Sequence, residues 1–205
     1  MLEGLISVIN NLDFSLFYFI NVTMNNYILT LIMPVISELG VKEYWIIGCG
    51  ALYLFSYYKG GERVRKAAVL CLIAVLIAFY TNEILKTIFQ RPRPFMTHQG
   101  VNLVRHSNYI FPSGHSAKYS FPSGHSAVIF AACTIFSRKF GYWPLFMALA
   151  CLVGFSRIYL GFHYPLDVVF GALLGIGISL LILKYENQIW GGFSGLIRRI
   201  KSFSL

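Results

Sequence analysis

The stretch AAVLCLIAVLIAFYTN, residues 67–82, contains no charged side chain. A transmembrane helix needs about 20 mostly apolar residues, so this run must extend into its flanks to cross a bilayer. Other long stretches are also free of Lys, Arg, Asp and Glu: 14–37, 44–58, 119–137, 140–156 and 168–183. Their recurrence along the whole chain indicates a membrane protein with several spans.

The composition of the chain agrees with this interpretation. Of the 205 residues, 57% are hydrophobic and only 12% are charged, and the mean hydropathy is +0.64. A soluble domain is typically about 25% charged, and a disordered chain is rich in charge and poor in aromatic residues. Both classes are therefore excluded. With so apolar a chain, the net charge of +9 favours membrane lipids over nucleic acid as partners.

We predict an all-α fold, in which a single domain over 1–205 forms a six-helix transmembrane bundle. The first span is interrupted by Asn21, Asn25, Asn26 and Pro34, so an interfacial helix followed by a short span is the alternative there. Residues 186–205 combine apolar and basic side chains, and we expect an interfacial tail. The six predicted spans are 14–39, 43–58, 66–88, 124–138, 143–160 and 165–185.

The distribution of Lys and Arg predicts the orientation in the cell membrane. With six spans, both termini lie on the same side as the loops after the second and fourth spans. That side should be cytoplasmic, which turns the long connection 89–122 and the active site towards the exterior. It carries ten basic residues: Lys59, Arg63, Arg65, Lys66, Arg138, Lys139, Lys184, Arg198, Arg199 and Lys201.

Three clusters of polar residues lie at predicted span ends on the exterior side. The first contains Lys86 and Arg93, which are close to two helical turns apart and are followed by Pro94. Charges at membrane depth are costly and usually functional. A basic helix end anchored at the lipid headgroups is the alternative explanation when this cluster is taken alone.

The second cluster is the sequence Phe-Pro-Ser-Gly-His-Ser-Ala at 121–127, where a polar loop meets an apolar helix. The N–H groups at a helix N-terminus bind anions readily, and Ser123 and Gly124 are small enough to let an anion approach. His125 adds a group that can transfer a proton. An ordinary helix cap beside a surface histidine is the alternative.

The third cluster contains Ser156, Arg157, His163, Pro165 and Asp167. Pro165 suits the first turn of the last span, which places His163 just before that helix. The carboxylate of Asp167, four residues further on, could hydrogen-bond the imidazole and orient it for nucleophilic attack. A His–Asp pair that only stabilises a loop is the alternative.

The scarcity of acidic residues bears on the chemistry. Between Glu83 and Glu186, Asp167 is the only carboxylate, whereas a two-metal phosphatase needs several acidic or histidine ligands. We therefore expect no metal and no cofactor. The guanidinium groups of Arg93 and Arg157 suit the oxygens of a bound phosphate.

Together the clusters resemble the type-2 phosphatidic acid phosphatase superfamily, whose pattern is Lys-x6-Arg-Pro, Pro-Ser-Gly-His and Ser-Arg-x5-His-x3-Asp. This resemblance implies His163 as the nucleophile that forms a phosphohistidine, Asp167 as the group that orients it, and His125 as the acid for the leaving oxygen. It also implies a set of phosphate-binding residues, namely Lys86, Arg93, Ser123, Gly124 and Arg157.

The second motif occurs twice, at 111–117 and at 121–127, within a ten-residue tandem duplication. Both copies cannot occupy one site. An apolar helix follows His125, whereas Pro122 would break a helix that continued from His115. The second copy is therefore predicted to be catalytic, and the first to be additional loop or an artefact of the sequence. His98 and His106 lie in the same loop and are interpreted as polar filler rather than metal ligands.

The sequence thus predicts an integral-membrane lipid phosphatase. Undecaprenyl diphosphate is the favoured substrate, because the small layout with Leu12-Asp13, Leu16-Phe17 and Ile20-Asn21 near the start resembles the undecaprenyl-diphosphate phosphatases. Phosphatidylglycerophosphate and phosphatidate remain alternative substrates. A six-span lipid-binding or transport protein is the non-enzymatic alternative, and the oligomeric state is left open.

Overall fold

The structure, a computed structural model, describes residues 2–104 and 118–203, and within these ranges it is helical without any strand. π-helical turns at Phe19–Thr23 and Ser56–Gly60 follow α1 and α3. The helices are α1 (Leu2–Tyr18), α2 (Tyr27–Glu38), α3 (Lys42–Phe55), α4 (Gly61–Phe89), α5 (Pro94–Thr97), α6 (Gly124–Phe140), α7 (Trp143–Tyr159), α8 (Pro165–Lys184) and α9 (Glu186–Phe203).

The last five predicted spans agree with α3, α4, α6, α7 and α8 to within a few residues. The first does not, because α1 and α2 are separate helices where one helix over 14–39 was predicted. Asn26 is the physical reason. Its backbone is extended and its side chain accepts a hydrogen bond of 3.0 Å from the Leu29 N–H, so it starts a new helix as an N-cap.

Helix α6 lies at the centre of the bundle and packs against α4, α7 and α8. Its contact with α8 depends on two glycines one turn apart. A Cβ atom at Gly171 would collide with the carbonyl oxygen of Ser123, and one at Gly175 with that of Ala127. Small residues at this spacing let two membrane helices approach closely. This approach brings the N-terminus of α6 beside the first turn of α8.

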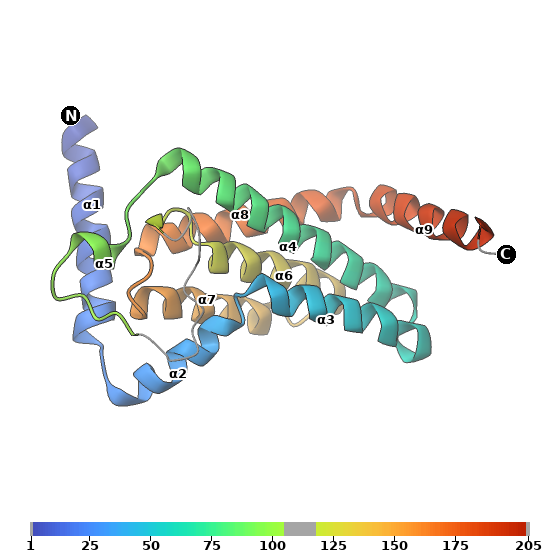
Figure 1. The fold of residues 1–205 in the computed structure, drawn as a ribbon, viewed down its shortest axis with the longest axis horizontal. Coiled ribbons are helices and arrows are strands. Elements are labelled where there is room, and N and C mark those ends of the chain that lie inside the picture. Colours follow the sequence, from blue (N-terminus) through green and yellow to red (C-terminus); the bar gives the residue numbers. More distant parts are fainter. Residues whose placement is uncertain (1, 105–117, 204–205) are drawn as a thin grey trace.

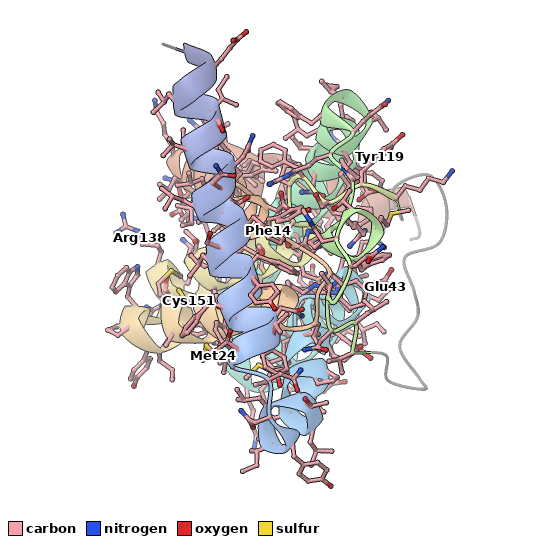
Figure 2. The ribbon with its side chains drawn as sticks, turned by 90° about the vertical axis from the view of Figure 1, so that its left-hand side faces the viewer. Phe14, Met24, Glu43, Tyr119, Arg138 and Cys151 are labelled. Carbon is pink, nitrogen blue, oxygen red and sulfur yellow. The ribbon has the colours of Figure 1, made fainter. Side chains whose placement is uncertain are left out.

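Figure 1 shows α3, α4, α6 and α8 running side by side along the long axis of the molecule. Helix α1 lies crosswise at one end of this bundle, and α9 leaves from the opposite end. Figure 2 looks onto the first end and shows α1 in front of the bundle, with Phe14 on it and Met24 where it turns towards α2. The prediction that both termini lie on the same side of the membrane remains a prediction.

Several described helices are suited to a membrane. Residues Glu3–Thr23, Gly61–Phe89 and Pro165–Lys184 form helical stretches long and apolar enough to cross one, and α2 and α7 are shorter apolar helices. The predicted count of six spans remains a prediction. Residues Glu186–Phe203 are helical as expected, and Trp190 fastens this tail to the bundle by donating a hydrogen bond of 2.8 Å to Glu62.

Candidate active site

The three sequence clusters meet at the end of the bundle that α1 crosses. The C-terminal part of α4 and the loop after it supply Lys86 and Arg93, and the end of α7 supplies Arg157. The α7–α8 connection supplies His163. These basic side chains are almost completely buried, with exposed fractions of 6% for Lys86, 2% for Arg93 and 1% for Arg157. Such burial separates them from ordinary headgroup anchors, whose charged ends stay in water.

The imidazole of His163 is held in one orientation. Its Nδ1 lies 2.7 Å from the carbonyl oxygen of Ser120, and because a carbonyl only accepts, Nδ1 carries the proton. Burial and the charges of Arg93, Arg157 and Lys86 hold the pKa of His163 well below its usual value of 6.5, although the Ser120 bond opposes this shift. His163 is therefore neutral at pH 7, with the lone pair of Nε2 unprotonated.

Asp167 is fully buried in the first turn of α8. Its Oδ2 lies 3.7 Å from Nδ1 of His163, which is close for a charge but too long for a hydrogen bond. The direct bond between these two groups that the spacing predicted is therefore replaced by the Ser120 carbonyl. The two oxygens of Asp167 instead accept 2.8 Å from the Tyr164 N–H and 2.7 Å from Arg91 Nη1.

The buried cations are held in place by hydrogen bonds to neutral acceptors and, for Lys86, by an ion pair with an acid. Arg93 Nη1 donates to the Phe162 carbonyl at 3.2 Å and lies 3.5 Å from Nε2 of His163. Arg157 donates to the hydroxyl of Ser37 at 2.6 Å. Lys86 is paired with Glu83 at 2.8 Å. The cluster therefore keeps an excess of positive charge that suits an anion.

The N-terminus of α6 carries the residues of the second motif, and Ser123 makes contacts of its own there. The Ser123 N–H donates to the Asp167 carbonyl at 2.9 Å, and its hydroxyl accepts 2.9 Å from the Ser126 hydroxyl. Ser123 thereby joins α6 to α8 and caps the helix. The N–H groups of Gly124 and His125, in the first helical turn, are the ones that an anion can use there.

His125 packs against Gly40, and the residue before it, Gly124, lies beside Asn82. A Cβ atom on Gly40, in the α2–α3 connection, would come within 2.7 Å of the Cβ of His125, so this glycine leaves space for the histidine. Within the described ranges, Nε2 of His125 has no hydrogen-bond partner, and neither amide atom of Asn82 has one. Asn82 is fully buried one turn before Lys86. A phosphoryl oxygen or a water molecule would satisfy these groups.

Comparisons with known proteins decide the family. The model of the PAP2 superfamily matches residues 67–190, more than half of the chain. The chain belongs to the PAP2 superfamily. The undecaprenyl-diphosphatase BcrC of Bacillus subtilis (strain 168) is 30% identical over 167 residues, which are 80% of this chain and 79% of that protein. The undecaprenyl-diphosphatase of Sulfolobus acidocaldarius is 33% identical over 166 residues, or 79% and 74%.

The PAP2 fold is also found among solved structures. The crystal structure of Aquifex aeolicus LpxE matches with a TM-score of 0.68 and 31% identity, and covers 85% of this chain and 96% of that one. The prediction of a PAP2 member with a helical membrane fold is therefore confirmed. The prediction of an enzyme is confirmed too, because the PAP2 relatives are phosphatases.

Sequence reasoning missed several polar residues of the candidate site. Ser37 accepts a hydrogen bond from Arg157, the carbonyl of Ser120 lies 2.7 Å from Nδ1 of His163, and Asn82 is buried one turn before Lys86. An isolated Ser or Asn in an apolar chain carries no recognisable signal. Arg91 stood inside the first motif without an assigned role. Asp13, on α1, binds Arg91, and only the fold could bring it there.

The remaining histidines of the long loop divide into two groups. His98 stacks on Phe14 with ring centroids 4.0 Å apart, which agrees with a packing role. His106 and the first motif copy at 111–117 lie outside the described residues. In the part of the chain that the structure describes, no group of three His, Cys, Asp or Glu side chains lies together as metal ligands would.

Proposed function

We propose that this protein is an undecaprenyl-diphosphate phosphatase that acts through a phosphohistidine at His163 without a metal. One observation carries this proposal: the Ser120 carbonyl holds Nδ1 of the buried His163 at 2.7 Å, which leaves Nε2 free to attack at 3.5 Å from the buried cation Arg93. Buried cations with too few acids favour a phosphate dianion. A neutral imidazole among them is a nucleophile aimed at its phosphorus.

The first chemical step follows from this geometry. Nε2 of His163 attacks the terminal phosphorus, and the bond from phosphorus to the leaving oxygen breaks as the N–P bond forms. His125 gives its proton to the leaving oxygen, for which its unpartnered Nε2 is available. The positive charge that develops on the imidazole is stabilised by the Ser120 carbonyl and by the carboxylate of Asp167, 3.7 Å away.

In the second step, His125 takes a proton from a water molecule that attacks the phosphorus. The N–P bond then breaks, inorganic phosphate leaves, and His163 returns to its neutral form. Lys86, Arg93, Arg157 and the first-turn N–H groups of α6 hold the phosphoryl oxygens through both steps, because charge on those oxygens is greatest in the transition states.

The site suits a lipid substrate because of its position. It lies at one end of the apolar bundle, beside α1, whose exposed face carries Leu5, Ile9, Leu12 and Leu16. A lipid tail can stay among these side chains while its phosphate enters the charged cluster. The undecaprenyl diphosphate assignment is supported by the names of two relatives. Phosphatidylglycerophosphate and phosphatidate are the competing lipid phosphates.

We further propose that the catalytic end faces the exterior and that α9 lies on the cytoplasmic side. The end of the bundle next to α9 carries Arg63, Lys66, Arg138 and Lys139, which fits the excess of basic residues in cytoplasmic loops. The test uses cells that express a variant in which the exposed Cys151 is replaced by Ser. A single cysteine is then introduced at Met96 or at Tyr142, both of which are exposed. A membrane-impermeant maleimide should label only the first. If only the cysteine at position 142 were labelled, the orientation would be the opposite of the one proposed.

The activity itself is tested with purified protein in detergent and excess chelator. Phosphate release is measured from undecaprenyl diphosphate, phosphatidylglycerophosphate and phosphatidate. The highest kcat/KM should belong to undecaprenyl diphosphate, and the chelator should have no effect. A preference for another lipid would correct the substrate, dependence on added metal would contradict the mechanism, and no release from any of them would contradict the proposal as a whole.

A further inference from the structure

The carboxylate beside His163 is held by Arg91, which lies within the first motif at a position that the motif leaves unspecified. Arg91 places Nη1 at 2.7 Å from Oδ1 of Asp167 and Nη2 at 2.6 Å from Oδ2 of Asp13. Its guanidinium also lies over the ring of Tyr164, 4.0 Å from the centroid. Three separate contacts fix the plane of this side chain, so it positions Asp167 rather than serving as a mobile surface charge.

Asp13 is the second acid of this chain of contacts, and it comes from a distant part of the sequence. It lies on α1 and is only 4% exposed. Its other oxygen accepts a hydrogen bond of 2.8 Å from the Leu166 N–H. Asp167 accepts in the same way from the Tyr164 N–H. Both carboxylates thus bind the start of α8, directly after His163, and both bind Arg91.

Helix α1 is fixed in place by a neighbouring contact. The fully buried side chain of Asn21 donates to the carbonyls of Asn102 and Tyr159 at 2.8 and 2.7 Å, and accepts 2.9 Å from the Asn102 N–H. These bonds join the segment after α1 to the end of α7 and to the loop after α5. Asp13 is therefore presented to Arg91 by a rigid support.

The charges explain why two acids share one arginine. A buried carboxylate needs a partner, but a guanidinium paired only with Asp167 would cancel the charge that His163 needs when it becomes positive. Asp13 offsets part of the charge of Arg91. The group of Asp13, Arg91 and Asp167 carries one net negative charge, which lies next to the imidazole.

We propose that Asp13 and Arg91 are positioning residues for catalysis, acting through Asp167 on His163. This inference rests on the proposed function, since it concerns the nucleophile of that mechanism. It assigns α1 a part in the reaction, although α1 lies outside the three motifs. Neither residue contacts the phosphate-binding cations in the described contacts, so their removal should affect turnover rather than substrate binding.

The test is Asp13→Asn, a change that keeps the shape and removes the charge. We expect kcat to fall roughly 10- to 100-fold, as for the loss of a hydrogen bond to a charged group, with KM changed less than about threefold. Asp13→Glu should recover part of kcat. Glu3→Gln removes an exposed carboxylate from the same helix and should leave kcat unchanged.

A double-mutant cycle separates positioning from folding. If Asp13 acts through Asp167, the double variant D13N/D167N should be no slower than D167N alone. Equal additive losses would overturn the inference, as would D13N activity within twofold of the wild type. If D13N does not fold, Arg91→Lys supplies the same readout, because a lysine cannot make both planar contacts. An inactive wild type would instead refute the proposed function.

Discussion

Both ends of the bundle carry clustered cations, but the cations differ in their burial and in their pairing with acids. At the catalytic end, Arg93 and Arg157 are buried among helix ends and backbone carbonyls. At the end next to α9, Arg138 is exposed, and Lys66 and Lys139 are both paired with Glu186. The hydrogen bond from Lys139 is the main cause of the lowered pKa of Glu186.

The difference separates a binding site from an anchor. Charges exposed to water and paired with acids contribute little on their own, and they suit a surface that rests on lipid headgroups. Burying a cation without an acidic partner costs desolvation free energy, and a bound anion would offset that cost. We therefore expect substitutions at the catalytic end to have large effects on activity, and substitutions at the end next to α9 to have small ones.

The largest effect expected from the catalytic end, apart from loss of the nucleophile, concerns its acid. His125→Ala should lower kcat by about 10²- to 10⁴-fold, the usual contribution of a general acid. His115→Ala, in the first copy of the duplicated motif, is the matched control and should keep wild-type activity. Phosphate release from undecaprenyl diphosphate measures both. The reverse pattern would assign catalysis to the first copy.

A matched pair of arginine substitutions compares the two ends directly. Arg157→Lys keeps the charge but loses the planar guanidinium, so kcat/KM should fall by about 10- to 100-fold. Arg138→Lys makes the same change at the basic end and should alter kcat/KM less than about twofold. Similar losses at both positions would remove the distinction between site and anchor.

Packing behind the catalytic end gives a smaller effect on stability. Gly175→Ala should destabilise the bundle by about 1–3 kcal/mol, because the added methyl group meets the carbonyl of Ala127. Gly177 lies on the same helix with open space around it, so Gly177→Ala should not lower the unfolding midpoint. Thermal unfolding in detergent compares the two. Equal midpoints would contradict the close α6–α8 contact.

The smallest effect is a pH dependence of stability from His163. Its folded pKa lies well below 6.5, so below pH 6.5 the unfolded chain binds a proton that the folded one does not. The contribution of His163 therefore lowers the free energy of unfolding as the pH falls below 6.5, by at most about 1.4 kcal/mol per pH unit. Unfolding midpoints at pH 7.5 and 5.5 should differ more for the wild type than for His163→Asn. An equal drop in both would contradict a neutral His163.

Most of the helices could be predicted from the sequence, because membrane helices are recognisable by their apolar composition. Charge-free runs predicted five helices well, and the positions of the three clusters at span ends on one predicted side indicated which helix ends would meet. The break before α2 was harder, since Asn26 fits a polar interruption of a span as well as an N-cap. Its extended backbone decided between them.

The contacts around the catalytic carboxylate could not be predicted in this way. The spacing of His163 and Asp167 suggested a direct hydrogen bond, but backbone geometry gave that position to the Ser120 carbonyl. Asp13 is far from Arg91 in the sequence, and no local pattern links them. Such contacts depend on how α1 crosses the end of the bundle, which is a property of the tertiary fold.

The most direct test of the central claim is to trap the phosphorylated enzyme. Purified protein is mixed with undecaprenyl diphosphate labelled on its terminal phosphate, with chelator present, and the reaction is quenched rapidly in alkaline denaturant. We expect protein-bound label that is stable in base and labile in acid, that maps to His163 by mass spectrometry, and that is absent from the His163→Asn variant. Label on another residue, or turnover by the wild type without any labelled protein, would contradict it.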